Sequence, residues 1–422
     1  MTVAVEHPAD ELTPLADYLA GALRRLVPLP PLDLPLSEAH GRVLAEDVTA
    51  AGPWPAYDAA AIDGYAVAAA DLNGGDTPVR LAVLGYLTAA SSGVSPLAAG
   101  GCFAVAAGAP LPVAADTVVP AEWTDRGTAV VEIRERPRRG HGVRRTGEEL
   151  PTGDLLAPAG TTLTPAVLAV LAATGVTQVS VRPRPRVVVL ATGDELVESA
   201  TAAGGSRPGQ VVDVSCRAVA AAVVEAGGEA YAGICADDPH RLCALLAGQA
   251  ERADLIVTTG GTGTGPGDVV RQVLCRRDGA RAPSVTFTEL AAYPCGRLGF
   301  GTVGEAQVPV VCLPGDPGTA LVGFEVLARP AIQVLAGVEP VFRPGVRGHL
   351  RESVRSPAGL REFRPALVTE RRGGGYTVAP LPGGPHTLAG MARGNALMVL
   401  GERVDRAPAG TDVDVLLLDR RR

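Results

Sequence analysis

Three turns in the sequence combine glycine with hydroxyl and carboxylate side chains, and each directly follows a run of apolar residues. ATGDELV covers residues 191–197, TTGGTGTGPGD covers 258–268, and LPGDPGTA covers 313–320. Backbone amides and helix N-termini suit phosphate, whereas carboxylates suit Mg²⁺, which can bridge to a phosphate. The turns therefore predict a site for a phosphorylated ligand, with these carboxylates near it: Asp194, Glu195, Asp268 and Asp316.

Some of these acidic residues also have a purely structural explanation. Asp213, Asp238 and Asp316 stand where helix N-caps stand, and the last two are followed directly by proline. Asp194 and Glu195 lie on a turn rather than at a helix start, so capping explains them less well. The glycine loop is not a Walker A motif, because no lysine follows it, and it lacks the GxGxxG of a dinucleotide turn. Capping and ligand binding therefore both stay open for the three aspartates.

The elements around the three turns predict that they meet. After the linker-like RPRPR at 182–186, apolar strand segments alternate with helical segments as far as residue 335. Such alternation implies a parallel sheet with helices on both faces, in which ligands bind at the carboxyl ends of the strands. We therefore expect the three turns to lie at one edge of a doubly wound α/β domain.

The flanking segments have other patterns. Helical periodicity runs from about residue 10 to 48, including a helix with Ser37 as its N-cap, and it returns in a helix with Thr164 as its N-cap. Short β segments separated by glycine and proline lie between these two stretches and again after residue 342. The predicted domains are a helical linker domain of 1–50 with 140–183, an inserted β-rich domain at 51–139, the α/β domain at 184–340, and a small C-terminal β-barrel domain at 341–422.

Composition narrows the class of protein. A formal net charge of −7 over 422 residues, with no concentrated basic face, argues against a nucleic-acid partner. All 38 basic residues are arginine, so no step can use a lysine nucleophile. The seven cysteines are scattered singly, which argues against a disulfide framework and favours a reducing cytoplasm. The sequence shows neither a signal peptide nor an apolar run that would span a membrane.

The order and wording of the short motifs resemble a known family. They resemble the molybdopterin molybdenumtransferases, the MoeA-like molybdenum insertases, to which the gephyrin E domain is similar. The resemblance covers nearly the whole chain. The motifs that carry it are DGYA from Asp63, GAPLP from Gly108, RRTGEE from Arg144, TGDEL from Thr192, DDPH from Asp237, GGTGTGPGD from Gly260, LPGDP from Leu313 and ARGNALMVL from Ala392.

The resemblance implies a homodimer of elongated four-domain subunits with its site at the subunit interface. The substrates would be adenylylated molybdopterin and molybdate, with Mg²⁺ or another divalent ion, and a molybdopterin-adenylating protein would act upstream. Hydrolysis of the adenylate would accompany insertion of molybdenum. Two alternatives stay open: a divergent non-catalytic paralogue that acts as a pterin-binding or protein scaffold, and an unrelated nucleotide-phosphate enzyme.

The resemblance also assigns roles to residues of this chain. Glu195, Asp237 and Asp268 would position metal and water, and Asp63 would act as a fourth catalytic residue from across the dimer. The backbone amides from Gly260 to Gly265 would hold the pterin phosphate. The residues expected to bind the cofactor are Thr192, Gly193, Asp194, Gly260, Gly261, Thr262, Gly265, Arg297, Pro314, Gly315, Asp316 and Arg364.

The chain departs from the family pattern mainly at hydroxyl and cationic positions. The family's KPGKP appears as YPCGR at 293–297, so Arg297 alone can supply a cation there. Because hydroxyls and cations are lost, we expect weakened anion recognition. Because the carboxylates are intact, we expect metal binding to be kept. The other substituted positions are Ala60, Ala107 and Gly263 in place of Ser, Thr and Ser, with Asp316 in place of Asn and Pro385 in place of Ser.

Overall fold

The computed structural model describes residues 12–73, 78–92, 96–198, 208–275 and 283–418. By its internal contacts the chain forms two compact units. The first contains Met1–Leu32 and Arg182–Arg422, and the second contains Asp33–Val181.

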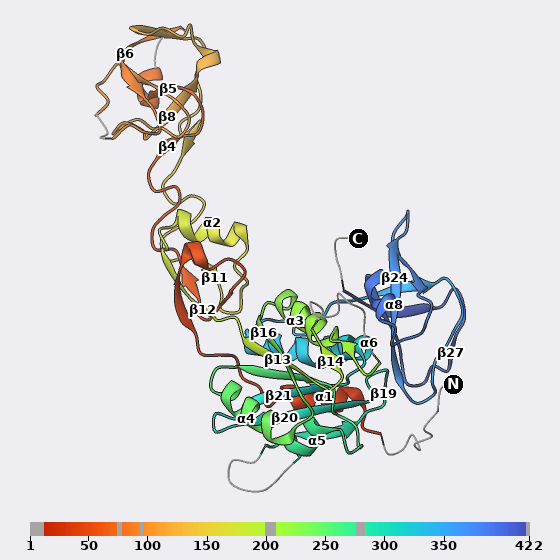
Figure 1. Cartoon of the computed structure of the whole chain (residues 1–422). Coiled ribbons are helices and arrows are strands. Elements are labelled where there is room, and N and C mark those ends of the chain that lie inside the picture. The colour runs from red at the N-terminus through yellow and green to blue at the C-terminus, as the bar shows by residue number, and fades with distance from the viewer. Residues whose placement is uncertain (1–11, 74–77, 93–95, 199–207, 276–282, 419–422) are drawn as a thin grey trace. The chain divides into compact units, whose positions relative to one another are not determined.

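A six-stranded sheet forms the centre of the first unit (Figure 1). Four neighbouring strands are parallel, and an antiparallel pair completes one edge. The parallel sheet was predicted, whereas the antiparallel edge was not. In spatial order the strands are β16 (Glu229–Cys235), β13 (Arg186–Thr192), β17 (Leu255–Thr259), β21 (Val308–Leu313), β20 (Arg297–Val303) and β18 (Thr286–Glu289).

Strand β13 shows why the sheet is covered on both faces. Val187 and Val189 pack into one buried cluster, while Val188 and Leu190 pack into another. Because successive side chains of a strand point to opposite faces, each face needs its own helical cover. The first cluster includes residues of α1 (Leu15–Leu23), α3 (Ser215–Glu225) and the helix at 317–335, and the second includes α4 (Pro239–Ala250) and α5 (Val269–Leu274).

The longest helix is continuous from Pro317 to Leu335. It consists of α6 (Pro317–Gly323), the π-helical turn η6 (Phe324–Ala328) and α7 (Arg329–Leu335). Among the described residues it alone is long and apolar enough to cross a membrane, but 78% of that window is buried inside the protein. Its burial against the sheet is the pattern of a core helix.

The C-terminal strands form a closed ring of five, as the predicted β-barrel requires. Strand β24 pairs with both β25 and β26, so the order β24-β25-β22-β28-β26 returns to its start. Helix α8 (Leu388–Arg393) contacts β24. The strands are β22 (Gly345–Leu350), β24 (Arg361–Glu370), β25 (Tyr376–Pro380), β26 (Ala396–Leu400) and β28 (Asp412–Leu417).

In its described residues the second unit contains a five-stranded sheet and one α-helix. That helix, α2 (Pro165–Ala173), begins as predicted, because the Thr164 side chain accepts a hydrogen bond from the Val167 amide. The sheet has the order β8 (Thr117–Pro120), β5 (Gly64–Val67), β7 (Gly101–Val105), β6 (Val79–Leu87) and β9 (Val130–Ile133). Shorter pairings join residues before and after this sheet, including β3 (Val48–Thr49) with β11 (Leu155–Ala157).

The predicted helix from Ser37 is wrong. Only the three-residue 3₁₀ turn η2 (Leu36–Glu38) forms there, followed by the short strand β2 (Val43–Leu44). Gly41 adopts a positive φ of 73°, and the Leu44 amide donates to the Thr161 carbonyl. Long-range backbone pairing thus replaces the helical hydrogen bonds that the local periodicity favoured. The domain boundaries themselves stay predictions.

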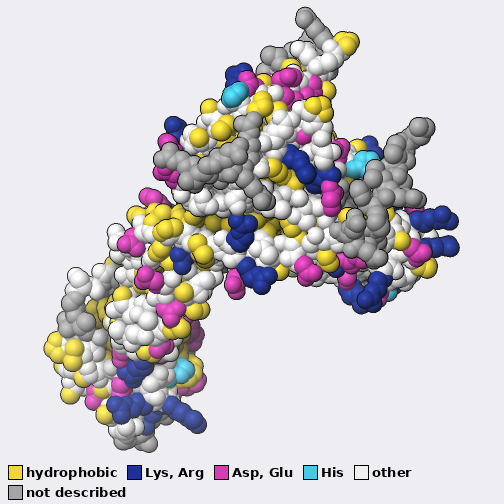
Figure 2. All heavy atoms as spheres, turned by 90° about the horizontal axis from the view of Figure 1, so that it is seen from below, with side chains coloured by type: hydrophobic (Ala, Val, Ile, Leu, Met, Phe, Trp, Pro, Cys, Tyr) yellow, Lys and Arg dark blue, Asp and Glu magenta, His cyan; other side chains and the backbone are white. Residues whose placement is uncertain are grey.

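Acidic and basic side chains are interspersed on the face shown in Figure 2, without a separate basic field. This distribution agrees with the negative net charge.

Candidate functional site

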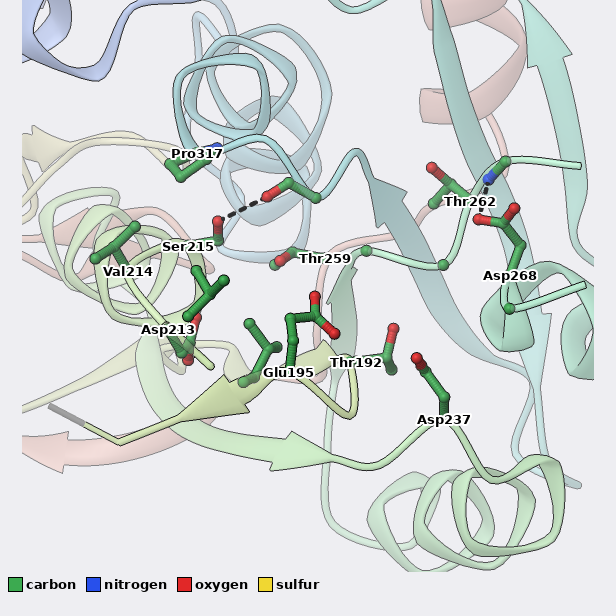
Figure 3. A pocket seen from close by; sticks show the side chains of 18 of the residues that line it. Thr192, Glu195, Asp213, Val214, Ser215, Asp237, Thr259, Thr262, Asp268 and Pro317 are labelled. Atoms are coloured by element: carbon green, nitrogen blue, oxygen red, sulfur yellow. Dashed lines mark hydrogen bonds between the residues drawn. The ribbon is translucent and has the colours of Figure 1, made fainter. Parts of the chain in front are cut away.

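The three glycine-containing turns lie together at the carboxyl ends of the parallel strands of the central sheet (Figure 3). In the parallel register Ala191 stands opposite Thr259, which stands opposite Leu313. The turns after β13, β17 and β21 therefore begin side by side, as predicted. Together with residues after β15 (Val211–Val212) and β16 they surround a cavity of about 380 Å³.

The cavity brings together nine of the residues predicted for the site. They come from four separate stretches of sequence, which only the parallel register of the sheet places next to one another. These nine lining residues are Thr192, Gly193, Glu195, Asp237, Gly260, Gly261, Thr262, Asp268 and Gly315.

Gly260 and Gly261 let the loop after β17 pass close to β13. Both have positive φ angles, of 92° and 60°. A Cβ at Gly260 would lie 2.8 Å from the carbonyl oxygen of Thr192, and one at Gly261 would lie 3.0 Å from the backbone nitrogen of Val270. Glycine is required here because a side chain would meet backbone atoms that cannot move aside.

The Asp268 carboxylate accepts two hydrogen bonds from amides of the glycine loop that precedes it. Its Oδ1 accepts a hydrogen bond from the Gly263 amide and its Oδ2 accepts one from the Gly265 amide, both at 2.7 Å. Two of the amides predicted to hold phosphate therefore already have an anionic partner within the chain. Any amide contribution to ligand binding would come from the rest of the loop.

Four carboxylates line the cavity, those of Glu195, Asp213, Asp237 and Asp268. Among the described residues, no arginine, lysine or histidine lines it. Burial raises the pKa of Asp237, and the negative charges of Asp194, Glu195 and Asp268 raise it further. A hydrogen bond from the Asp194 amide acts in the opposite direction. The site is therefore acidic, and an anionic ligand needs a cation to enter it.

Thr192 presents an unpaired hydroxyl to this cavity. Its residue is only 6% exposed, and its Oγ1 has no hydrogen-bond partner among the residues that the structure describes. A buried hydroxyl without a partner is costly, so a ligand atom or water at this position would restore the missing hydrogen bond.

Asp194 and Asp237 connect the loops after β13 and β16. The Asp237 amide donates to Asp194 Oδ1 at 3.0 Å, and the Asp194 amide donates to Asp237 Oδ2 at 3.4 Å. Asp194 does not line the cavity. Its side chain instead holds the backbone from which the Asp237 carboxylate projects.

The predicted capping role of Asp238 is confirmed, because it accepts from the amides of His240 and Arg241 at the start of α4. Asp213 is not the N-cap residue of α3, which is Val214. It stands one position earlier, where its Oδ1 accepts from the Cys216 amide and the residue also lines the cavity.

Asp316 caps α6, and its loss should destabilise the first unit. Its Oδ2 accepts from the amide of Thr319 at 2.9 Å and from the hydroxyl of Thr319 at 2.6 Å. We expect Asp316→Ala to cost about 1 kcal/mol, which lowers the thermal unfolding midpoint by about 2–4 °C. Circular dichroism measures the shift. Asp316→Asn keeps an acceptor oxygen and should unfold near the parent temperature; equal losses in both variants would contradict a capping role.

The sequence reasoning missed one side of the cavity. Residues from Val211 to Ser215 line it, and the Ser215 Oγ donates a hydrogen bond at 3.0 Å to the Gly315 carbonyl (Figure 3). The segment VVDVS lacks the glycines that identified the other turns. Its one usable signal was Asp213, for which capping and ligand binding both stayed open.

Several predicted residues do not line the cavity. Asp194, Gly265, Pro314 and Asp316 are close neighbours of lining residues in sequence, but they lie outside its wall. Gly265 and Asp316 serve the two loops internally, through the Asp268 carboxylate and the start of α6.

Both predicted arginines are engaged elsewhere in the first unit. Arg297 forms an ion pair with Glu289, with its Nε 2.5 Å from Glu289 Oε1. The Nε of Arg364 donates to Oε1 of the fully buried Glu362 at 2.8 Å. Neither lines the cavity.

Asp63 belongs to the second compact unit. Its Oδ1 accepts a hydrogen bond from the Ala107 amide at 2.8 Å. Ala107 lacks the hydroxyl of the family's threonine, but its backbone amide still supports the Asp63 carboxylate.

The oxygen donors of the cavity fit a Mg²⁺ ion that also binds a phosphate. Among the described residues there is no group of three His, Cys, Asp or Glu side chains that could hold a metal ion by themselves. Mg²⁺ does not need such a cage, because it commonly uses one or two carboxylates and takes its other ligands from water and substrate phosphates. Glu195 and Asp237, beside the orphaned Thr192 hydroxyl, match this chemistry.

Three family descriptions match successive parts of the chain. Residues 13–175 match the MoeA N-terminal region (domain I and II), and residues 188–334 match a probable molybdopterin binding domain. Residues 347–418 match the MoeA C-terminal region (domain IV). The matched ranges together cover most of the sequence.

Individual relatives extend over nearly the same length. Molybdopterin molybdenumtransferase 2 of Mycobacterium tuberculosis is 36% identical over 389 residues, which are 91% of this chain and 94% of that protein. Molybdopterin molybdenumtransferase 1 of the same organism is also 36% identical, over 411 residues, covering 92% and 95%. A crystal structure of a molybdopterin biosynthesis MoeA protein from Pyrococcus horikoshii superposes with a TM-score of 0.80 at 28% identity, covering 97% of this chain and 99% of that one.

Proposed function

The chain belongs to the MoeA family of molybdopterin molybdenumtransferases, and on that premise we propose that it hydrolyses adenylylated molybdopterin and inserts molybdenum from molybdate into the pterin. It is a transferase of molybdenum cofactor biosynthesis. The proposal for the site rests on one observation: an acidic cavity, which no cation lines among the described residues, lies at the carboxyl ends of the parallel strands.

Glu195 and Asp237 are the proposed cation-binding pair. When Mg²⁺ is bound, it supplies positive charge that neutralises and polarises the phosphoanhydride of the substrate. Glu195 and Asp237 would hold the ion, and Thr192 would offer its hydroxyl to the ligand. Attack of water then releases AMP and leaves the pterin phosphate.

The remaining expected residues complete the site in the proposed homodimer. We propose that Asp63 comes from a second copy of the chain, and that Arg297 and Arg364 add positive charge at the same interface. Two points support this arrangement. The chain belongs to the family, and the cavity of one chain has no lining cation among its described residues. A molybdopterin-adenylating protein is the proposed upstream partner.

The cytoplasm is the proposed location. All seven cysteines are free thiols, five of them buried. Burial raises the pKa of Cys295 and Cys312 to about 12, which leaves these two thiols protonated and unreactive. A reducing compartment is compatible with this pattern.

Release of AMP tests the function directly. The full chain is incubated with adenylylated molybdopterin, Mg²⁺ and molybdate, and AMP is measured by chromatography beside a Mycobacterium tuberculosis relative. We expect AMP release that depends on both Mg²⁺ and molybdate. Binding of the pterin without AMP release would contradict the proposal and favour the scaffold alternative, which the names of the relatives do not favour.

A further inference from the structure

The three carboxylates expected to position metal differ in how far their oxygen atoms are already used. Both oxygens of Asp268 accept short hydrogen bonds from loop amides. Asp237 accepts one long hydrogen bond, at 3.4 Å. Within the described part of the chain, the Glu195 carboxylate accepts none. Glu195 and Asp237 therefore have lone pairs to offer to a cation, whereas Asp268 has given its strongest acceptor positions to the loop.

The position of the Asp268 carboxylate depends on the absence of a side chain at residue 263. A Cβ built on Gly263 would lie 2.6 Å from Asp268 Oδ2 and 2.9 Å from Oδ1. These distances are shorter than any real contact, so one of the two groups would have to move. The Asp268 carboxylate would move, because it is the end of a rotatable side chain while Cβ is fixed to the backbone.

Residue 263 itself tolerates a side chain. Its φ does not lie in the left-handed region, so a Cβ there causes no backbone strain. The three atoms nearest to this Cβ all belong to the Asp268 carboxylate. The first effect of a substitution at residue 263 should therefore fall on Asp268.

We propose that Gly263 determines the role of Asp268 in this chain, by leaving room for its carboxylate to bind the amides of Gly263 and Gly265. Asp268 is then a positioning residue that shapes the glycine loop, and the cation is held by Glu195 and Asp237. A side chain at residue 263 would turn Asp268 into the cavity that it lines, as a third carboxylate for the cation. The inference rests on the proposed function of the site.

Titration of the full chain with Mn²⁺ alone tests this inference. Affinity for a divalent cation rises with the number of charged ligands, so we expect Gly263→Ala to bind Mn²⁺ about fivefold more tightly than the parent. In an Asp268→Asn background the same substitution should have no effect. Gly267→Ala is the matched control on the same loop, because its added Cβ meets nothing within 4 Å.

A gain of affinity separates this inference from general damage to the loop, which could only weaken binding. A Gly263→Ala protein that binds Mn²⁺ no more tightly than the parent would overturn it, as would a gain that persists with Asp268→Asn. Where binding is too weak to measure, a crystal structure of Gly263→Ala decides: the carboxylate must have left the amides. The titration uses no pterin, so its outcome is independent of whether the chain releases AMP.

Discussion

Replacing Glu195 by glutamine should slow the release of AMP by about a hundredfold, comparable to removing one preorganised charge-stabilising group from an active site. Glutamine keeps the shape of the side chain but removes its negative charge. The Glu195 carboxylate lines the cavity and accepts no hydrogen bond within the described part of the chain, so the loss should fall on cation binding rather than on folding.

The rate of AMP release at saturating pterin, measured across a range of Mg²⁺ concentrations, checks this expectation. Glu229→Gln is the matched control, because Glu229 begins strand β16 at the opposite, amino end of the parallel strands. The control should retain the parent rate. A Glu195→Gln protein with an unchanged rate would remove Glu195 from the cation-binding pair.

Replacing Phe324 by alanine should destabilise the first unit by about 4 kcal/mol. Phe324 is 1% exposed and is among the largest fully buried side chains. It belongs to the buried cluster that joins the 317–335 helix to the central sheet. The sheet and this helix pack tightly, so truncation of the ring leaves a cavity that its neighbours fill only in part.

Far-UV circular dichroism measures the effect as a fall of about 10 °C in the unfolding midpoint. Tryptophan fluorescence would not report it, because Trp54 and Trp123 both lie in the second unit. Phe342→Ala is the control, since Phe342 is 46% exposed and its truncation should change stability little. Equal shifts in the two variants would show that Phe324 is not an anchor of the core.

The two arginines expected at the site are each paired with an acidic residue of the same chain. Arg297, the cation that remains in YPCGR, is paired with Glu289, and Arg364 is paired with Glu362. Neither arginine is therefore free of an acidic partner within one chain. In the proposed homodimer, recognition of an anionic substrate would depend on the proposed cation and on residues of a second copy. Loss of Glu195 would weaken the binding of that cation, so its expected effect is large.

Local patterns in the sequence were sufficient for the parallel strands of the central sheet and for the caps of two helices. The apolar runs of β13, β17 and β21 are buried on both faces, and a strand of that kind reads as continuous hydrophobicity. Asp238 and Asp316 were recognisable as caps because each precedes a proline at the first helical position. The convergence of the glycine turns followed from the parallel order alone.

Other features depended on contacts between residues far apart in the chain. The segment after Ser37 has helical periodicity, but its backbone pairs with carbonyls more than a hundred residues away, such as that of Thr161. Ser215 joined the cavity because its hydroxyl reaches the Gly315 carbonyl, a hundred positions along the chain. No local propensity encodes such a partner.

The sequence by itself determined the family motifs, the parallel strands and the set of carboxylates at their ends. Only the tertiary structure decided which of those carboxylates has oxygen atoms left for a ligand. Asp268 and Glu195 are the same kind of group in the sequence, yet the Asp268 oxygens are bound by two loop amides and the Glu195 oxygens by none in the described chain. The physical reason is that a hydrogen bond depends on the distance and direction between two groups, and the folded loop around Gly263 sets both.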